Sequence, residues 1–258
     1  MRDLSELREF YPQHLRGRGE DILREYLQYE ILKLIFSSKY ALKYTFLGGT
    51  CLRIAYGTDR FSEDLDFDNV GLEKEEFEDT ARIIQDGLVQ LGYEVHLKFA
   101  YKGAYHCNIR FPGLLFDYDL SPHKEARLLI KLDTEKQYFD YQREVYDLNK
   151  FGVRHPIRVT PAALLVSQKI AAVMGRKRAK GRDFYDLHFM LRHHRPNYRY
   201  LEARFGVTSP EGLRKLVGDH IAGLDFAALG RDVAPFLMHP ADLERVTAFP
   251  DFWQQTPL

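Results

Sequence analysis

The stretch YTFLGGT at residues 44–50, followed by SEDLDF at residues 62–67, decides the fold of this chain. The first four residues are aromatic, β-branched or Leu, so they favour a strand. Gly48 and Gly49 permit a sharp bend and let backbone N–H groups approach a polyphosphate without obstruction by a Cβ atom. Thr50 is expected to open a helix, where its hydroxyl can cap the helix or contact a terminal phosphate.

Asp64 and Asp66 stand at alternate positions of the second motif. Side chains of a strand alternate between its faces, so both carboxylates should point one way while Leu65 and Phe67 point into the core. Two carboxylates on one face suit Mg²⁺, and two such ions about 3.5–4 Å apart would hold the attacking and leaving oxygens of a phosphoryl displacement. Ser62 would share this face, which puts its hydroxyl near a bound triphosphate and makes it a candidate for an inhibitory phosphoryl modification.

Each motif alone has a purely structural explanation. A Gly-Gly pair is most often only a turn, and an isolated Asp-x-Asp is most often a solvated strand face or loop. A second such pair, Asp117 and Asp119, lies between Pro-Gly and Ser-Pro and is expected to be a solvated loop. The order strand, Gly-Gly, helix, Asp-x-Asp instead indicates a metal-dependent phosphoryl or nucleotidyl transfer site.

The runs FLGGTCLRI at residues 46–54 and RFSEDLDF at residues 60–67 resemble the first motif of the AbiEii/AbiGii toxin nucleotidyltransferases. The resemblance continues with KIAA at residues 169–172 and GRDFYDL at residues 181–187, so it touches most of the chain. It implies a polymerase-β-like nucleotidyltransferase core, a mixed sheet with flanking helices, and a helical C-terminal part. It also implies membership of bacterial toxin–antitoxin or abortive-infection systems, and some relatives transfer nucleotides to tRNA.

The resemblance also implies roles for residues of the later motifs. Lys169 matches the family's lysine and is expected to neutralise the triphosphate, although a lysine on an apolar helix is most often only at the edge of the apolar face. Asp183 matches the motif aspartate and is expected to organise the site, with the alternative that it caps the next helix. Asp186 is expected to be a structural partner of Arg182.

A third carboxylate on a neighbouring strand is common in nucleotidyltransferases of this type, and Asp133 is the best candidate. It ends the alternating run of residues 128–133. Asp133 would either complete the metal site or take the proton from an acceptor hydroxyl. The alternative is that it only begins a turn at the end of the strand.

Basic residues gather between the two later motifs. The cluster would suit a phosphate backbone, although charge runs are usually solvated loops between helices. Arg53 and Arg60 are expected either to bind phosphate or to form ion pairs. The members of the cluster are Arg176, Lys177, Arg178, Lys180 and Arg182.

The periodicity predicts two domains of different class. Residues 1–155 are expected to form the α/β nucleotidyltransferase domain, and residues 156–258 a helical domain that contributes Lys169 and Asp183 to the site. The helical pattern starts at Thr160, a cap, with Pro161 as the first helical residue. The predicted helices cover 20–40 and 73–91, and the predicted strands cover 93–100, 104–111 and 127–133.

Composition limits the partners and the compartment. The net charge is zero, so any RNA contact must come from local basic patches. Cys51 and Cys107 show no metal-ligand spacing and are expected to be reduced core thiols. The first residues carry no apolar leader, and no run approaches membrane-spanning length, so we expect a soluble cytoplasmic protein with no membrane contact.

The resulting functional hypothesis is transfer of NMP from an NTP to an acceptor hydroxyl, with Mg²⁺ as cofactor and a tRNA 3′ end as acceptor. A cognate antitoxin is an expected partner. Two alternatives remain at this point. The acceptor could be a small molecule or a protein, or the chain could be a non-catalytic module that only binds an NTP.

Overall fold

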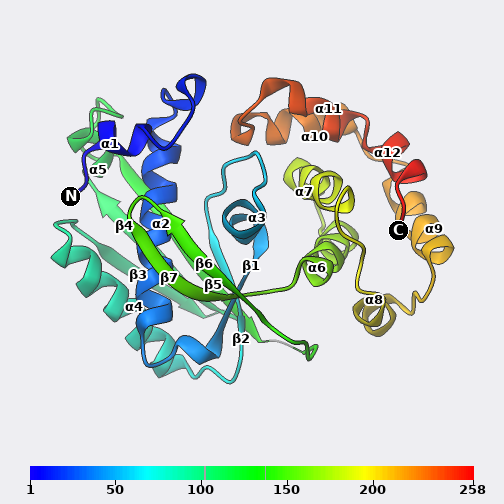
Figure 1. Ribbon diagram of the computed structural model, residues 1–258, viewed down its shortest axis with the longest axis horizontal. Helices are drawn as coiled ribbons and strands as arrows, with labels where there is room; N and C mark the ends of the chain where they lie inside the picture. The colour runs from blue at the N-terminus through cyan, green and yellow to red at the C-terminus, as the bar shows by residue number, and fades with distance from the viewer. Residues whose placement is uncertain (102, 137) are drawn as a thin grey trace. The chain divides into compact units, whose positions relative to one another are not determined.

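A mixed β-sheet and the helices packed on it form the first of two structural units (Figure 1). The computed structural model describes residues 1–101, 103–136 and 138–258. The first unit comprises residues 1–55 and 61–159, and the second comprises residues 56–60 and 160–258. The mixed α/β class predicted from the sequence is confirmed.

The described strands form one sheet in the order β3-β4-β5-β2-β1-β7-β6. β2 pairs with β5, and β1 with β7, in parallel, whereas the other neighbours are antiparallel. The strands are β1 (Tyr44–Leu47), β2 (Leu65–Asn69), β3 (His96–Tyr101), β4 (Tyr105–Pro112), β5 (Arg127–Lys136), β6 (Glu144–Lys150) and β7 (Val153–Val159). The accompanying helices are α1 (Leu4–Arg8), α2 (Gly19–Ser37), α3 (Gly48–Tyr56), α4 (Lys74–Gln90) and α5 (Leu114–Asp117), with short 3-10 turns η1 (Gln13–Leu15) and η2 (Ala41–Lys43).

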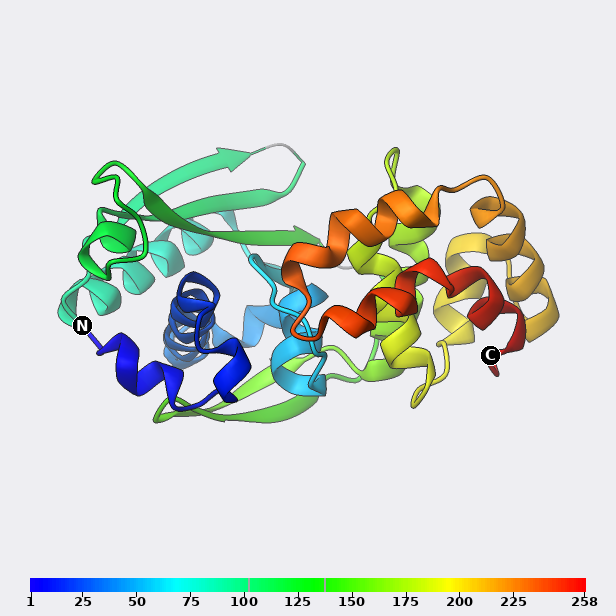
Figure 2. The ribbon, with the colours of Figure 1, turned by 90° about the horizontal axis from the view of Figure 1, so that it is seen from above.

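One face of the sheet packs against α2 and α4, which lie side by side (Figures 1 and 2). Every second residue of β4 and β5 is buried on this face, and the residues between them are half-buried or exposed. The opposite face of β3, β4 and β5 is therefore polar. The buried side chains include Leu65 and Phe67 of β2, as predicted, Cys107 and Ile109 of β4, and Ile130 and Leu132 of β5.

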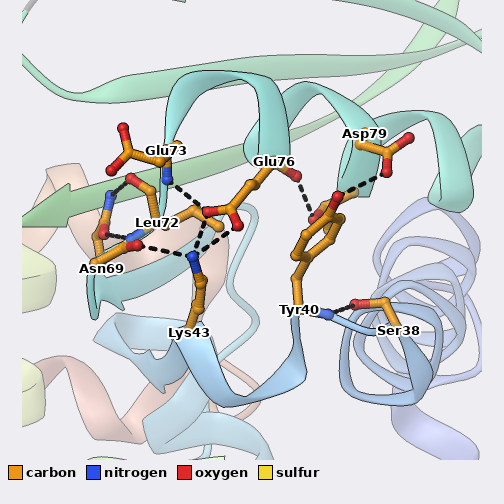
Figure 3. A network of polar contacts seen from close by, with 10 residues as sticks. Ser38, Tyr40, Lys43, Asn69, Leu72, Glu73, Glu76 and Asp79 are labelled. Atoms are coloured by element: carbon orange, nitrogen blue, oxygen red, sulfur yellow. Dashed lines mark hydrogen bonds and ion pairs between the residues drawn. The ribbon is translucent and has the colours of Figure 1, made fainter.

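A polar network fixes the start of α4 beside the ends of β1 and β2 (Figure 3). Glu76 accepts a hydrogen bond from the backbone N–H of Glu73 at 2.8 Å in a capping box, and one from Lys43 Nζ at 2.7 Å. Asn69, the last residue of β2, accepts a hydrogen bond from the backbone N–H of Leu72 at 2.7 Å. The capping box satisfies N–H groups that a helix start leaves unpaired, and the bonds of Lys43 and Asn69 fix where α4 begins relative to the sheet.

The helices predicted over 20–40 and 73–91 are α2 and α4, and the predicted strands are β1, β2, β3, β4 and β5. The sequence does not predict the β6–β7 hairpin. β6 is an edge strand with mostly exposed residues, and β7 contains Pro156, which weakens a strand pattern. Its turn uses Phe151 and Gly152, both at positive φ.

The second unit is helical. α6 begins one residue later than predicted, because Pro161 occupies the N-cap position and not the first helical position. Phe184, Phe249 and Trp253 are fully buried and centre its core. The helices are α6 (Ala162–Gly175), α7 (Gly181–Leu191), α8 (Tyr198–Phe205), α9 (Pro210–Ile221), α10 (Phe226–Val233), α11 (Glu244–Thr247) and α12 (Phe249–Gln255), with turns η3 (Ala234–Phe236) and η4 (Pro240–Leu243). Within the described ranges, none of the helices has the length and apolar character needed to cross a membrane.

Candidate active site

Asp66 and Asp133 lie side by side on the parallel strands β2 and β5, where they are register partners. Partners in adjacent strands point to the same face of the sheet, with their backbones about 4.8 Å apart. Because Leu65 and Phe67 are buried on the helix-covered face, Asp66 and Asp133 belong to the opposite, polar face. β5 continues to Lys136, so the alternative that Asp133 ends a strand and begins a turn is wrong.

Asp64 lies directly before β2, which begins at Leu65. Its carboxylate is 3.9 Å from Nζ of Lys131, which stands two residues before Asp133 on β5. Residues two apart on a strand share a face, so this contact places Asp64 on the same face as the other two carboxylates. The three predicted carboxylates therefore lie on one face of β2 and β5.

Gly48 leaves the space that the Asp66 carboxylate occupies. Gly48 has a φ of +80°, and a Cβ atom there would lie 2.9 Å from Asp66 Cβ and closer still to Oδ2. Gly48 is therefore required for two reasons: its backbone has a positive φ, and there is no room for a Cβ atom. Gly49 follows it as the second residue of α3.

Replacing Gly48 by Ala is expected to misplace Asp66 and to lower nucleotidyl transfer by about 100-fold, because such a loss follows a displacement of about 1 Å in an active site. Positive φ alone should cost about 1–2 kcal/mol of stability. Gly71→Ala is the matched control, since Gly71 has a φ of +65° and nothing within 4 Å of its would-be Cβ atom. Rate assays and urea unfolding of both variants should show a stability loss in each, larger in Gly48→Ala because of the contact with Asp66, and a rate loss in Gly48→Ala only. Equal rates in the two variants would contradict the role of Gly48.

Thr50 has a different place from the one predicted. α3 begins at Gly48, two residues earlier than expected, so Thr50 does not open or cap it. Thr50 is fully buried, and its hydroxyl donates a hydrogen bond to the backbone carbonyl of Asp64. The hydroxyl therefore fixes the backbone from which the Asp64 carboxylate projects.

Ser62 lies outside the strand. The backbone carbonyls of Ser62 and Glu63 accept hydrogen bonds from Gln28 Nε2, at 2.9 and 3.0 Å. Because these bonds hold the segment as a loop and β2 begins only at Leu65, the prediction that Ser62 shares a strand face with Asp64 is wrong.

His106 of β4 joins the carboxylate row, and sequence reasoning missed it. It is the register partner of Asp133, and its Nδ1 lies 2.8 Å from Asp133 Oδ1. The alternation of β4 shows that His106 faces away from the core, but the sequence does not report which residue of β5 it pairs with. The row across the polar face is therefore Asp66, Asp133 and His106.

The donor chemistry of this row fits Mg²⁺. Carboxylate oxygens are its preferred protein ligands, and one or two carboxylates suffice when substrate phosphates complete the coordination. Among the described residues, no three His, Cys, Asp or Glu side chains are gathered closely enough to hold a metal ion by themselves. That Asp64, Asp66 and Asp133 hold the ion together with substrate phosphates therefore stays a prediction.

Arg53 is an ion-pair partner, one of the two roles that the sequence allowed. Glu25 of α2 is buried between Arg53 Nε at 2.9 Å and Lys150 Nζ at 2.6 Å. Burial opposes ionisation of Glu25, but these two cations outweigh it and hold the pKa of Glu25 below its usual range. This cluster ties α3 to α2 and β6 inside the first unit.

In the second unit, Arg60 and Asp186 form a fully buried, bidentate ion pair. Arg60 Nε and Nη2 each lie 2.7 Å from a carboxylate oxygen of Asp186, and both side chains are at most 1% exposed. Lys169 Nζ lies 2.7 Å from the same carboxylate. The expectation that Asp186 pairs with Arg182 is therefore wrong. Of the two roles expected for Arg60, phosphate binding or an ion pair, the structure shows the ion pair.

Lys169 is held between two aspartates. Its Nζ donates a hydrogen bond to Asp183 at 3.0 Å and contacts Asp186 at 2.7 Å, and its side chain is 12% exposed. Burial would lower the pKa of Lys169, but the two carboxylates raise it above its usual value, so the ammonium stays charged. Asp183 lies in the first turn of α7, inside the helix, so it does not cap a helix beginning at Phe184.

The basic cluster is partly engaged within the second unit. Arg176 Nε lies 2.8 Å from Asp183, and Lys180 Nζ lies 3.6 Å from Asp232. Lys177 and Arg178 are exposed. Arg176, Lys177, Arg178 and Lys180 thus lie in the loop between α6 and α7, as the alternative expects, and two of them form ion pairs. Arg182 lies in the first turn of α7.

Comparison with known proteins agrees with this architecture. The family described as nucleotidyl transferase AbiEii toxin, type IV toxin–antitoxin system, matches residues 31–239. The crystal structure of JHP933 from Helicobacter pylori is similar, with a TM-score of 0.55, 18% identity and coverage of 91% of this chain and 92% of that chain. A "putative nucleotidyltransferase from H. pylori" has the same TM-score and identity and coverage of 91% and 94%. At this identity the two structures show a shared fold, and no curated protein sequence matches the chain.

Proposed function

This chain belongs to the AbiEii nucleotidyltransferase family of type IV toxin–antitoxin systems, and we propose that it transfers NMP from an NTP to a hydroxyl at the 3′ end of tRNA. The proposal rests on one observation above the others, the side-by-side placement of Asp66 and Asp133 on the polar face. Paired carboxylates on rigid strands are the arrangement that metal-assisted nucleotidyl transfer requires. Family membership also supports an antitoxin as partner.

In the proposed reaction, the acceptor oxygen forms a bond to the α-phosphorus of the NTP. The bond from that phosphorus to the oxygen bridging to the β-phosphate breaks, and pyrophosphate leaves. The proton of the acceptor hydroxyl goes to Asp133, or to solvent if Asp133 is a metal ligand. Mg²⁺ held by Asp64 and Asp66, and by Asp133 where that carboxylate does not take the proton, would neutralise charge on the phosphate oxygens.

The remaining site residues have proposed roles in holding the triphosphate. Gly48, Gly49 and Thr50 at the start of α3 offer backbone N–H groups that the helix itself does not use. Lys169 keeps the role that the motif of the family implies, neutralisation of the triphosphate, and Asp183 and Asp186 keep its ammonium charged. Asp183 would act through Lys169 as a positioning residue.

The proposal is tested by incubating the purified chain with Mg²⁺, total bacterial tRNA and one α-labelled NTP at a time. We expect label on tRNA with a preferred NTP, release of pyrophosphate, and loss of both when EDTA removes the metal. Label on a protein or a small molecule would instead identify a different acceptor class. NTP binding without transfer to any acceptor would favour the non-catalytic alternative.

A further inference from the structure

The polar face of β3, β4 and β5 continues beyond the carboxylate row as three further rows of side chains. The register pairs Lys98 with Asn108 and Asn108 with Lys131 in the row nearest Asp133. The next row joins His96, Arg110 and Leu129. The last contains Arg127 beside Pro112. Successive rows are two residues apart along each strand, so all of these side chains share the face of Asp133 and His106.

These rows carry four cations, Lys98, Arg110, Arg127 and Lys131, which we call the cationic face. Lys98, Arg127 and Lys131 are exposed, and Arg110 is half-buried. Lys131 contacts Asp64 at 3.9 Å, whereas the side chains of Lys98, Arg110 and Arg127 form no hydrogen bond or ion pair with the described residues. In the described strands, these rows contain no Asp or Glu.

We propose that the cationic face binds the phosphate backbone of a single-stranded RNA end whose terminal hydroxyl lies at Asp66 and Asp133. The inference rests on the proposed function, because it takes the carboxylate row as the place of transfer. The face has the required polarity: acidic at one end, where metal and triphosphate would bind, and basic along the rest. A polynucleotide entering from the Arg127 end would pass the four cations before it reaches the carboxylate row, with Glu94 lying 3.1 Å from His96 at the edge of the second row.

The length of the face favours a polynucleotide over the triphosphate of the NTP. Arg127 is six residues from Asp133 on the same strand, which corresponds to about 20 Å at 3.3 Å per residue. The described residues of β3, β4 and β5 place no Phe, Tyr or Trp on this face, so the aromatic rings available for stacking there are the imidazoles of His96 and His106. Binding should therefore depend on phosphates and not on base sequence.

The test compares two doubly substituted chains that lose the same charge. Lys98→Gln with Arg110→Gln alters the cationic face. Lys33→Gln with Arg204→Gln is the matched control, because both residues are exposed, on helices α2 and α8, and form no ion pair with the described residues. The probe is a fluorescent, single-stranded, mixed-sequence oligoribonucleotide, and its anisotropy is measured over a salt series without NTP.

We expect the Lys98→Gln, Arg110→Gln chain to bind RNA about ten-fold more weakly at low salt, with a salt slope reduced by about 1.4, or about 0.7 for each lost phosphate contact. The control should match the unsubstituted chain. In the transfer assay, the KM for tRNA should rise and the KM for NTP should stay constant. A rise in the KM for NTP alone would assign the face to the triphosphate and overturn the inference.

Measuring RNA binding and nucleotidyl transfer in the same chains distinguishes a failure of this inference from a failure of the proposed function. If RNA binding depends on Lys98 and Arg110 but the chain transfers nothing to RNA, the cationic face binds RNA and the proposal that tRNA is the acceptor is wrong. If the chain transfers NMP to tRNA but both variants bind RNA as well as the unsubstituted chain does, the inference about the cationic face is wrong and the proposed function stands. An absence of RNA binding by the unsubstituted chain would also overturn it, and would favour an acidic protein as occupant.

Discussion

Asp66→Ala is expected to lower nucleotidyl transfer by about 1,000-fold or more while leaving the fold intact. The rate loss corresponds to about 4 kcal/mol of transition-state stabilisation, within the several kcal/mol that charge neutralisation at a metal site supplies. The change in stability should stay small beside this rate loss, because removal of Asp66 also relieves repulsion with Asp133, its register partner. Rates with labelled NTP and urea unfolding of the same preparation measure the two effects.

Two further variants make this prediction specific. Asp66→Asn keeps the volume and removes the charge, so it should be as inactive as Asp66→Ala. Asp117→Ala removes an exposed aspartate of the rival Asp-x-Asp pair and should keep full activity. If Asp66→Ala retained more than about a tenth of the rate, the carboxylate row would not be the place of transfer.

Asp186→Ala is expected to destabilise the second unit by about 3–5 kcal/mol, because it leaves the buried guanidinium of Arg60 without its bidentate partner. Thermal and urea unfolding of the full chain measure the loss. Lys215→Ala is the control for an ordinary ion pair, since Lys215 and Asp219 are 81% and 72% exposed. Its effect should stay below about 1 kcal/mol.

Replacing both members of the buried pair distinguishes the cost of leaving one buried charge unpaired from the cost of removing the ion pair altogether. Arg60→Met combined with Asp186→Leu removes both charges and should recover much of the stability that Asp186→Ala loses. If Asp186→Ala were no more harmful than Lys215→Ala, the buried pair would contribute little to the fold.

The contribution of Asp186 also has a defined pH dependence. Burial opposes its ionisation, but Arg60 and Lys169 outweigh burial and hold the pKa of Asp186 below its usual value. A depressed folded-state pKa means that the stabilisation is fully present above the unfolded-state value, about 3.9, and is lost as the pH falls below it. The second unit should therefore keep this contribution at neutral pH and lose it in acid.

Local patterns predicted the elements that carry the site, and long-range pairing explains what they missed. The Gly-Gly and Asp-x-Asp motifs placed β1, α3 and β2 because glycine conformation and side-chain alternation are properties of adjacent residues. The prediction for Ser62 was wrong because the hydrogen bond that holds its backbone outside β2 comes from Gln28, which is 34 residues away. The partner of Asp186 was missed for the same reason, since Arg60 is 126 residues away.

The sequence by itself determined the α/β class, the family and the identity of the three candidate carboxylates. The tertiary structure alone decided that Asp133 stands beside Asp66, that His106 joins them and that Lys169 is held by two aspartates. It also aligned the four cations of the cationic face on one side of the sheet. The physical reason is that alternation specifies which face a side chain takes, whereas the register between strands depends on the packing of the whole sheet.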